Sequence, residues 1–65
     1  MSTLVQASQL VLGDEVMMSL KEQPNEYYKG YVAYGEVLGR GFEMILVLEN
    51  ESLLELNDQF CNYWL

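Results

Sequence analysis

The side chains that most often carry enzyme chemistry are scarce in this sequence. It contains no histidine and a single cysteine, Cys61, so neither a serine nor a cysteine nucleophile has an imidazole base to activate it. The same composition excludes an internal disulfide and a zinc site built from cysteine and histidine. Glu36 and Glu43 would face each other across a turn over 39–41, yet charged residues beside a hairpin are normally solvated. The sequence therefore predicts a protein that is not an enzyme.

Tyrosines and carboxylates gather in the first half of the chain in a combination suited to binding. Aromatic faces together with carboxylates hold lysine or arginine side chains well. The alternative is that alternate tyrosines of a strand pack inward, so we expect only the exposed ones to bind. The predicted partner-binding residues, completed by the tryptophan near the C-terminus, are Glu22, Glu26, Tyr27, Tyr28, Tyr31, Tyr34 and Trp64.

A second acidic group lies in the C-terminal half. Its charge spacing imitates that of a nucleic-acid backbone, although solubility is the commoner meaning of such a run. The carboxylates do not follow the spaced oxygen pattern of a calcium loop, so we expect neither a metal nor a cofactor. The predicted acidic stripe consists of Glu43, Glu49, Glu51, Glu55 and Asp58.

The overall charge points to the kind of partner. Ten acidic residues against three basic ones give a formal net charge of −7, which repels phosphate backbones, while 51% hydrophobic residues are too many for a disordered tail. We therefore expect a folded domain that binds a basic protein and does not bind nucleic acid directly. The longest apolar run, Met44 to Leu48, is far short of the ~20 residues of a membrane-spanning helix. The stretch before Leu12 lacks the positive charge of a secretory signal, so we expect a soluble, cytoplasmic protein.

The chain reads as one domain over 1–65, with 1–9 as an arm or short helix and 11–65 as a β domain. Turn signals at Gly13-Asp14 and around Pro24 separate segments rich in β-branched and aromatic residues. The slip in alternation near Gly35 predicts a bulge or a sharp bend. The predicted strands cover residues 15–20, 28–38, 42–49 (the most buried), 52–56 and 60–65.

The C-terminal segment admits a second interpretation. Ser52 and Glu55 fit the capping box that opens helices, and the apolar residues after them share one side of a helical wheel. The alternative fold is therefore a three-stranded antiparallel sheet with one C-terminal helix. The turn signal at Asn50-Glu51 favours a short hairpin and thus the all-β fold.

This order of elements resembles an SH3-like barrel over residues 11–65. The resemblance is carried by the Gly13-Asp14-Glu15-Val16 opening, an irregular loop at 21–27, the Gly30-Tyr31-Val32 strand and a hairpin into Met44 to Leu48. It is a likeness of fold and not of one family, and it implies an all-β, five-stranded small barrel. In signalling members an acidic, aromatic first loop grips proline-rich peptides. The residues at a similar place in this chain are Glu22, Glu26, Tyr27 and Tyr28.

Both faces of the 42–49 segment are hydrophobic, and a small barrel buries only one of them by itself. Self-association through the other face is therefore an expected property. The predicted function is that of a small, acidic, non-catalytic module that binds a basic protein surface or peptide. Two alternatives stay open: a nucleic-acid-mimicking inhibitor of a DNA- or RNA-binding protein, of the kind phages encode, and a stabilising subunit of a larger assembly.

Overall fold

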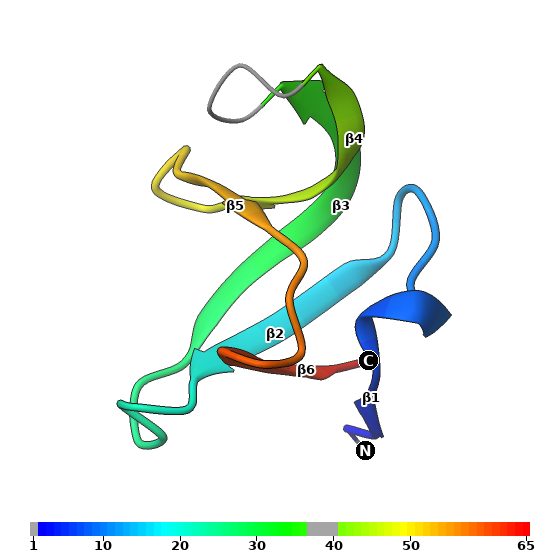
Figure 1. Ribbon diagram of the computed structural model, residues 1–65. Helices are drawn as coiled ribbons and strands as arrows, with labels where there is room; N and C mark the ends of the chain where they lie inside the picture. The colour runs from blue at the N-terminus through cyan, green and yellow to red at the C-terminus, as the bar shows by residue number, and fades with distance from the viewer. Residues whose placement is uncertain (1, 37–40) are drawn as a thin grey trace.

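A computed structural model describes residues 2–36 and 41–65 (Figure 1). They form one open sheet of six antiparallel strands in the order β1-β6-β2-β3-β4-β5, together with a single turn of 3-10 helix, η1. The chain is therefore mainly β, as predicted. The elements are β1 (Leu4–Val5), η1 (Ala7–Gln9), β2 (Glu15–Leu20), β3 (Tyr28–Glu36), β4 (Phe42–Leu48), β5 (Leu53–Glu55) and β6 (Cys61–Trp64).

The alternative fold with a C-terminal helix is wrong, because residues 52–64 contain the two strands β5 and β6. The Leu48 N–H donates to the Ser52 carbonyl at 2.9 Å, and Glu51 takes the left-handed conformation with φ of 68°. Ser52 is thus a member of a hairpin ladder and does not begin a helix.

Within the described residues, no helix is long and apolar enough to cross a membrane.

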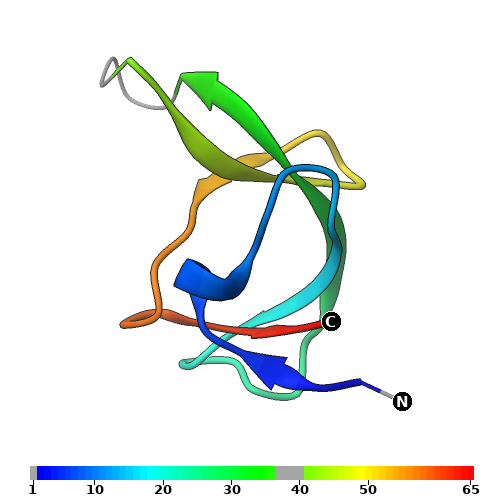
Figure 2. The same ribbon diagram turned by 90° about the vertical axis from the view of Figure 1, so that its right-hand side faces the viewer.

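The barrel predicted from the sequence is not closed, because the sheet has two free edges and β1 adds a strand beside β6. Thr3 and Leu65 exchange backbone hydrogen bonds of 2.8 and 2.9 Å beside the β1–β6 pair. β1 therefore occupies the side of β6 that β5 would need in order to close a ring, and β1 and β5 lie at opposite edges. The N-terminal segment covers one end of the curled sheet instead (Figure 2).

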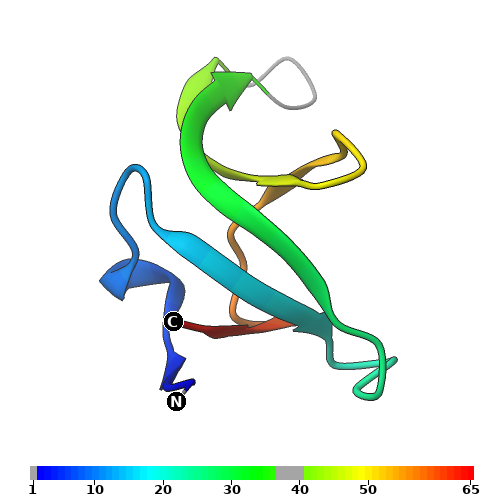
Figure 3. The ribbon, with the colours of Figure 1, turned by 180° about the vertical axis from the view of Figure 1, so that it is seen from behind.

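The longest strand, β3, bends across the sheet without a bulge (Figure 3). Its pairing with β4 runs unbroken from Gly30 opposite Leu48 to Glu36 opposite Phe42, so the bulge predicted near Gly35 is absent. Gly35 instead leaves room for Ile45, whose Cδ1 atom a Cβ at this position would meet. Residues 37–38 of the predicted strand, and positions 39 and 40 of the predicted turn, lie outside the described residues.

The core lies on one face of the sheet and is thin. Alternation along the strands turns every second side chain inward, and Leu10 joins them from the segment after η1. Tyr63, 1% exposed, also fixes the β5–β6 connection because its hydroxyl accepts a 2.8 Å hydrogen bond from the Asn57 N–H. The core residues are Leu10, Val16, Met18, Val32, Leu46, Leu48, Cys61 and Tyr63.

The opposite face of β4 is only partly covered by the chain itself. Ile45 is 1% exposed although it points away from the core, whereas Val47 on the same face is half-buried. We expected this whole face of β4 to need a partner, and that expectation is too broad. The part at Ile45 is already covered by the chain, whereas the part at Val47 is still accessible.

Gly30 permits the close approach of β3 and β4, and its substitution should be costly. A Cβ at Gly30 would collide with the Val47 carbonyl and lie 3.1 Å from its carbon, both of them backbone atoms that cannot move alone. We predict that Gly30→Ala lowers the free energy of unfolding by about 1–3 kcal/mol, measured by urea denaturation. Gly35→Ala is the matched control, because there the new Cβ meets only a side-chain end. Equal losses in the two variants would contradict this account.

The buried hydroxyl of Tyr63 should make the fold sensitive to high pH. Burial raises the pKa of Tyr63 above its ordinary value, so the folded chain retains this proton more tightly than the unfolded chain. The protonated hydroxyl therefore contributes to the free energy of unfolding, and this contribution is complete below the pKa of about 10 that tyrosine has in the unfolded chain. Above that pH the contribution falls, by at most about 1.4 kcal/mol per pH unit. Urea midpoints measured between pH 8 and 11 should fall more steeply for the natural sequence than for Tyr63→Phe. Parallel profiles would show that Tyr63 does not contribute.

Candidate functional site

The face of the sheet opposite the core, which we call the outer face, carries two rows of side chains that cross the strands. Register places Met17 of β2 between Trp64 of β6 and Lys29 of β3, and this is the first row. The second row continues from Glu15 of β2 to Tyr31 of β3, and from there to Val47 of β4. Because successive strand residues alternate between faces, the two rows lie roughly 7 Å apart along the strands.

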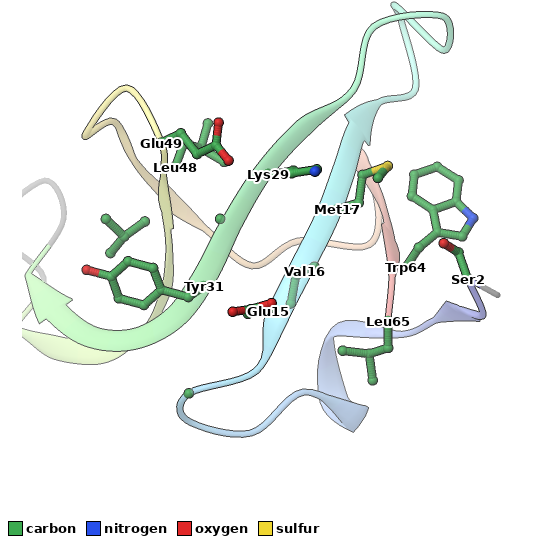
Figure 4. Close-up of a pocket in the computed structure, with 13 residues that line it drawn as sticks. Ser2, Glu15, Val16, Met17, Lys29, Tyr31, Leu48, Glu49, Trp64 and Leu65 are labelled. Atoms are coloured by element: carbon green, nitrogen blue, oxygen red, sulfur yellow. The ribbon is translucent and has the colours of Figure 1, made fainter.

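An open groove of about 720 Å³ lies between these rows. Its floor is strand backbone at Val16, Gly30 and Leu48, whose side chains face the core where they have one. The first row forms one wall and is extended by Glu49, and the second row forms the other (Figure 4). We call this feature the outer groove. Its walls comprise Met17, Lys29, Glu49 and Trp64 on one side and Glu15, Tyr31 and Val47 on the other.

Aromatic and aliphatic groups stand at both ends of the outer groove. Trp64 and Met17 occupy one end, and Tyr31 occupies the other (Figure 4). Val47 lies opposite Tyr31 in the β3–β4 pair and belongs to the same end. The Tyr31 side chain is 50% exposed, so half of its surface is free to contact a ligand. Trp64 is held from outside the groove by Tyr27, whose ring centroid lies 5.6 Å away in an edge-on arrangement. This contact orients the indole at the end of the groove.

The charges of the outer groove are mostly negative. Among its lining residues Lys29 is the one cation, against the carboxylates of Glu15 and Glu49 on opposite walls. Glu43 and Glu55 add two further carboxylates to the same face, in positions that flank Ile45. An apolar groove with acidic walls is therefore the dominant feature of this side of the protein.

The structure brings together only part of the predicted tyrosine surface. Tyr31 and Trp64 line the outer groove, and Tyr27 contacts Trp64. Tyr28 turns the other way: its hydroxyl donates to Glu26 at 3.1 Å, and this hydrogen bond and the carboxylate charge raise the pKa of Tyr28. Two more predicted residues are exposed but lie outside the groove, namely Glu22 and Tyr34.

The predicted acidic stripe is not one row either. Glu49 lines the outer groove, Glu51 lies in the β4–β5 turn, and Glu43 and Glu55 are half-buried beside Ile45. The Asp58 carboxylate instead accepts a 2.9 Å hydrogen bond from the Ala7 N–H and so fastens the N-terminal segment.

Sequence reasoning missed four members of the groove: Glu15, Met17, Lys29 and Val47. Period-two alternation already placed Val16, Met18 and Leu20 on one face of the first predicted strand, so Glu15 and Met17 had to share the other. The missing information was the register, which alone shows that Met17 lies beside Trp64 and that Tyr31 lies beside Val47.

The carboxylate pair that the sequence suggested is not assembled in the structure. Glu36 lies opposite Phe42 and Glu43 lies opposite Gly35, so these two carboxylates point to opposite faces and do not form the pair considered from the sequence. Over residues 2–36 and 41–65 the acidic and cysteine side chains form no cluster of three that would hold a metal ion. Comparison of the chain with protein-family models, curated proteins and solved structures gives no significant match.

The contact between Tyr27 and Trp64 can be tested directly, because Trp64 is the only tryptophan of the chain. We predict that Tyr27→Ala shifts the Trp64 fluorescence to longer wavelength, since the indole loses an aromatic neighbour and gains water. The expected loss of stability is about 0.5–1.5 kcal/mol. Tyr34→Ala, which removes an equally exposed tyrosine elsewhere, should leave the emission unchanged. An unshifted spectrum in Tyr27→Ala would show that the two rings do not touch in solution.

Proposed function

We propose that this protein is a non-catalytic interaction module that binds a basic partner protein in the outer groove. The observation that supports the proposal best is the half-exposed Tyr31 ring in an apolar groove that the chain leaves open. Exposed apolar hollows with aromatic anchors are typical of protein interfaces, where a few such side chains supply most of the binding energy.

The charge supports a basic partner. The formal net charge of −7 steers a cationic protein toward this surface, and Glu15 and Glu49 stand where its side chains would arrive. Such steering weakens as salt screens the charges, so the encounter rate is expected to fall with ionic strength. The tyrosines predicted from the sequence then have unequal roles: Tyr31 contacts the partner and Tyr27 supports Trp64.

We further propose that β2 to β6 form an SH3-like arrangement and that the protein works in the cytoplasm. In support of the first, β2, β3, β4 and β5 follow one another as neighbours and β6 returns to pair with β2. In support of the second, the lone Cys61 is a buried free thiol, which a reducing compartment preserves.

The two alternative functions receive less support. A nucleic-acid mimic needs its carboxylates in a regular exposed row, whereas Glu51 lies in a turn and Asp58 fastens the N-terminal segment. A stabilising subunit needs a large apolar face, whereas Ile45 is already covered by the chain.

The proposal is tested by affinity capture with three immobilised forms of the protein: the natural sequence, Tyr31→Ala and Tyr34→Ala. We predict that the natural sequence and Tyr34→Ala retain the same basic protein, and that Tyr31→Ala loses it by tenfold or more. The two tyrosines are similarly exposed, so the comparison removes any general effect of deleting a phenol ring. A partner that all three forms retain equally, or a partner that is acidic, would overturn the proposal.

A further inference from the structure

Resting on the proposed function, we infer that the outer groove takes an amphipathic α-helix of the partner, with lysine or arginine on both flanks of its apolar stripe. The ligand is thereby defined by its form, its length and the positions of its charges. Each of the three follows from a separate feature of the groove.

The hydrogen bonding of the groove floor selects a helix. The floor at Val16, Gly30 and Leu48 is backbone in the middle of the sheet, where β2 pairs with β3 and β3 pairs with β4. Its N–H and C=O groups point along the sheet to their partners and do not point into the groove. An extended peptide lying there would bury its own backbone groups without partners, whereas a helix satisfies them internally. Extended peptides that add a strand to a sheet bind at its edge, whereas this groove lies on a face of the sheet.

The distance between the two apolar ends gives the length of the helix. From Trp64 on β6 to Val47 on β4 the groove crosses three strand-to-strand spacings, or roughly 14 Å. A helix rises about 1.5 Å per residue, so roughly ten residues span the groove. Apolar side chains at positions i, i+4 and i+7 of such a helix would reach from the Trp64 end to the Tyr31 end.

The charged side chains of the walls place the cations of the partner. Glu15 and Glu49 belong to opposite walls, so a helix that rests on both walls and inserts its apolar side chains between them meets a carboxylate on each flank. Lys29 occupies the wall between Met17 and Glu49 and repels a cation at the centre of that side. The partner charges are therefore confined to the two flanks, near the two carboxylates.

A second copy of the chain is the obvious other occupant, and charge disfavours it. Two outer faces brought together would place Glu15 and Glu49 of both copies in one interface, with one lysine from each groove as compensation. A basic helix meets the same carboxylates with opposite charge, which favours a partner of another sequence.

The experiment uses three synthetic peptides without tryptophan, so that Trp64 fluorescence reports binding to the full chain. The helical probe consists of two Leu-Lys-Lys-Leu-Leu-Lys-Leu repeats, whose leucines share one face of a helix. The second probe rearranges the same residues as two Leu-Lys-Leu-Lys-Leu-Lys-Leu repeats, which favour a strand. In the third probe glutamate replaces every lysine of the helical peptide. We predict binding of the helical basic probe at least tenfold tighter than either of the others.

Variants connect the binding to the groove. Tyr31→Ala should weaken the helical basic probe by tenfold or more, and the double variant Glu15→Gln with Glu49→Gln should weaken it by about tenfold at low salt. Glu22→Gln and Tyr34→Ala are the matched controls and should bind like the natural sequence. Urea denaturation of each variant shows whether it is folded, and backbone amide NMR shifts in the natural sequence locate the probe independently of any substitution.

The outcomes separate this inference from the proposed function. Preference for the strand-forming probe, still dependent on Tyr31, would overturn the helix and leave a protein-binding groove. Equal binding of the acidic helix would overturn the assignment of charges. Binding of no probe, together with a dimer in sedimentation that Tyr31→Ala dissociates, would assign the groove to a second copy and overturn the inference. Tighter binding of the basic helix, lost in Tyr31→Ala and kept in Tyr34→Ala, would establish it.

Discussion

The close approach of β3 to β4 at Gly30 is the constraint on which the rest of the structure depends. β3 is the one strand that pairs with β2 on one side and with β4 on the other, so both halves of the sheet are held through it. Gly30 lies where these two ladders overlap, and the absence of a side chain lets the backbones come together. The same place is the middle of the groove floor, so sheet assembly and groove shape have one origin.

A thin core explains why the N-terminal segment packs against the sheet. A folded chain of 65 residues buries a modest share of its surface, so each additional element that covers the core adds to its stability. Leu10 closes the core from one side, while Asp58 and the Thr3–Leu65 pair fasten the segment at two points. The segment also completes the sheet beside β6 and thereby fixes the strand that carries Trp64. Residues far from the groove in sequence thus determine where the indole stands.

Local sequence patterns predicted much of the fold, but they could not predict which distant segments pair with each other. Alternation and turn residues located the segments that became β2, β3 and β4, because these signals act within a few residues. The capping box at Ser52 competed with the Asn50-Glu51 turn, and the hairpin prevailed because Leu48 offers Ser52 a ladder partner. β1 had no local signal: two residues become a strand only because β6 lies beside them. The same limit applies to the candidate site. Tyr31 and Trp64 were predicted from the sequence, but their neighbours Met17 and Val47 were not, because strand pairing brings them together.

Interleaving of core and groove residues along β2 has a consequence for how such a protein can change over time. Val16 and Met18 face inward, and Met17 between them faces the groove, so inserting or deleting one residue in this strand would exchange the two surfaces. The outer face can therefore change by substitution at the outward positions, while changes of chain length are tolerated only in the connections between strands. A lineage of this protein would keep its strand lengths constant long after the side chains of its groove had diverged.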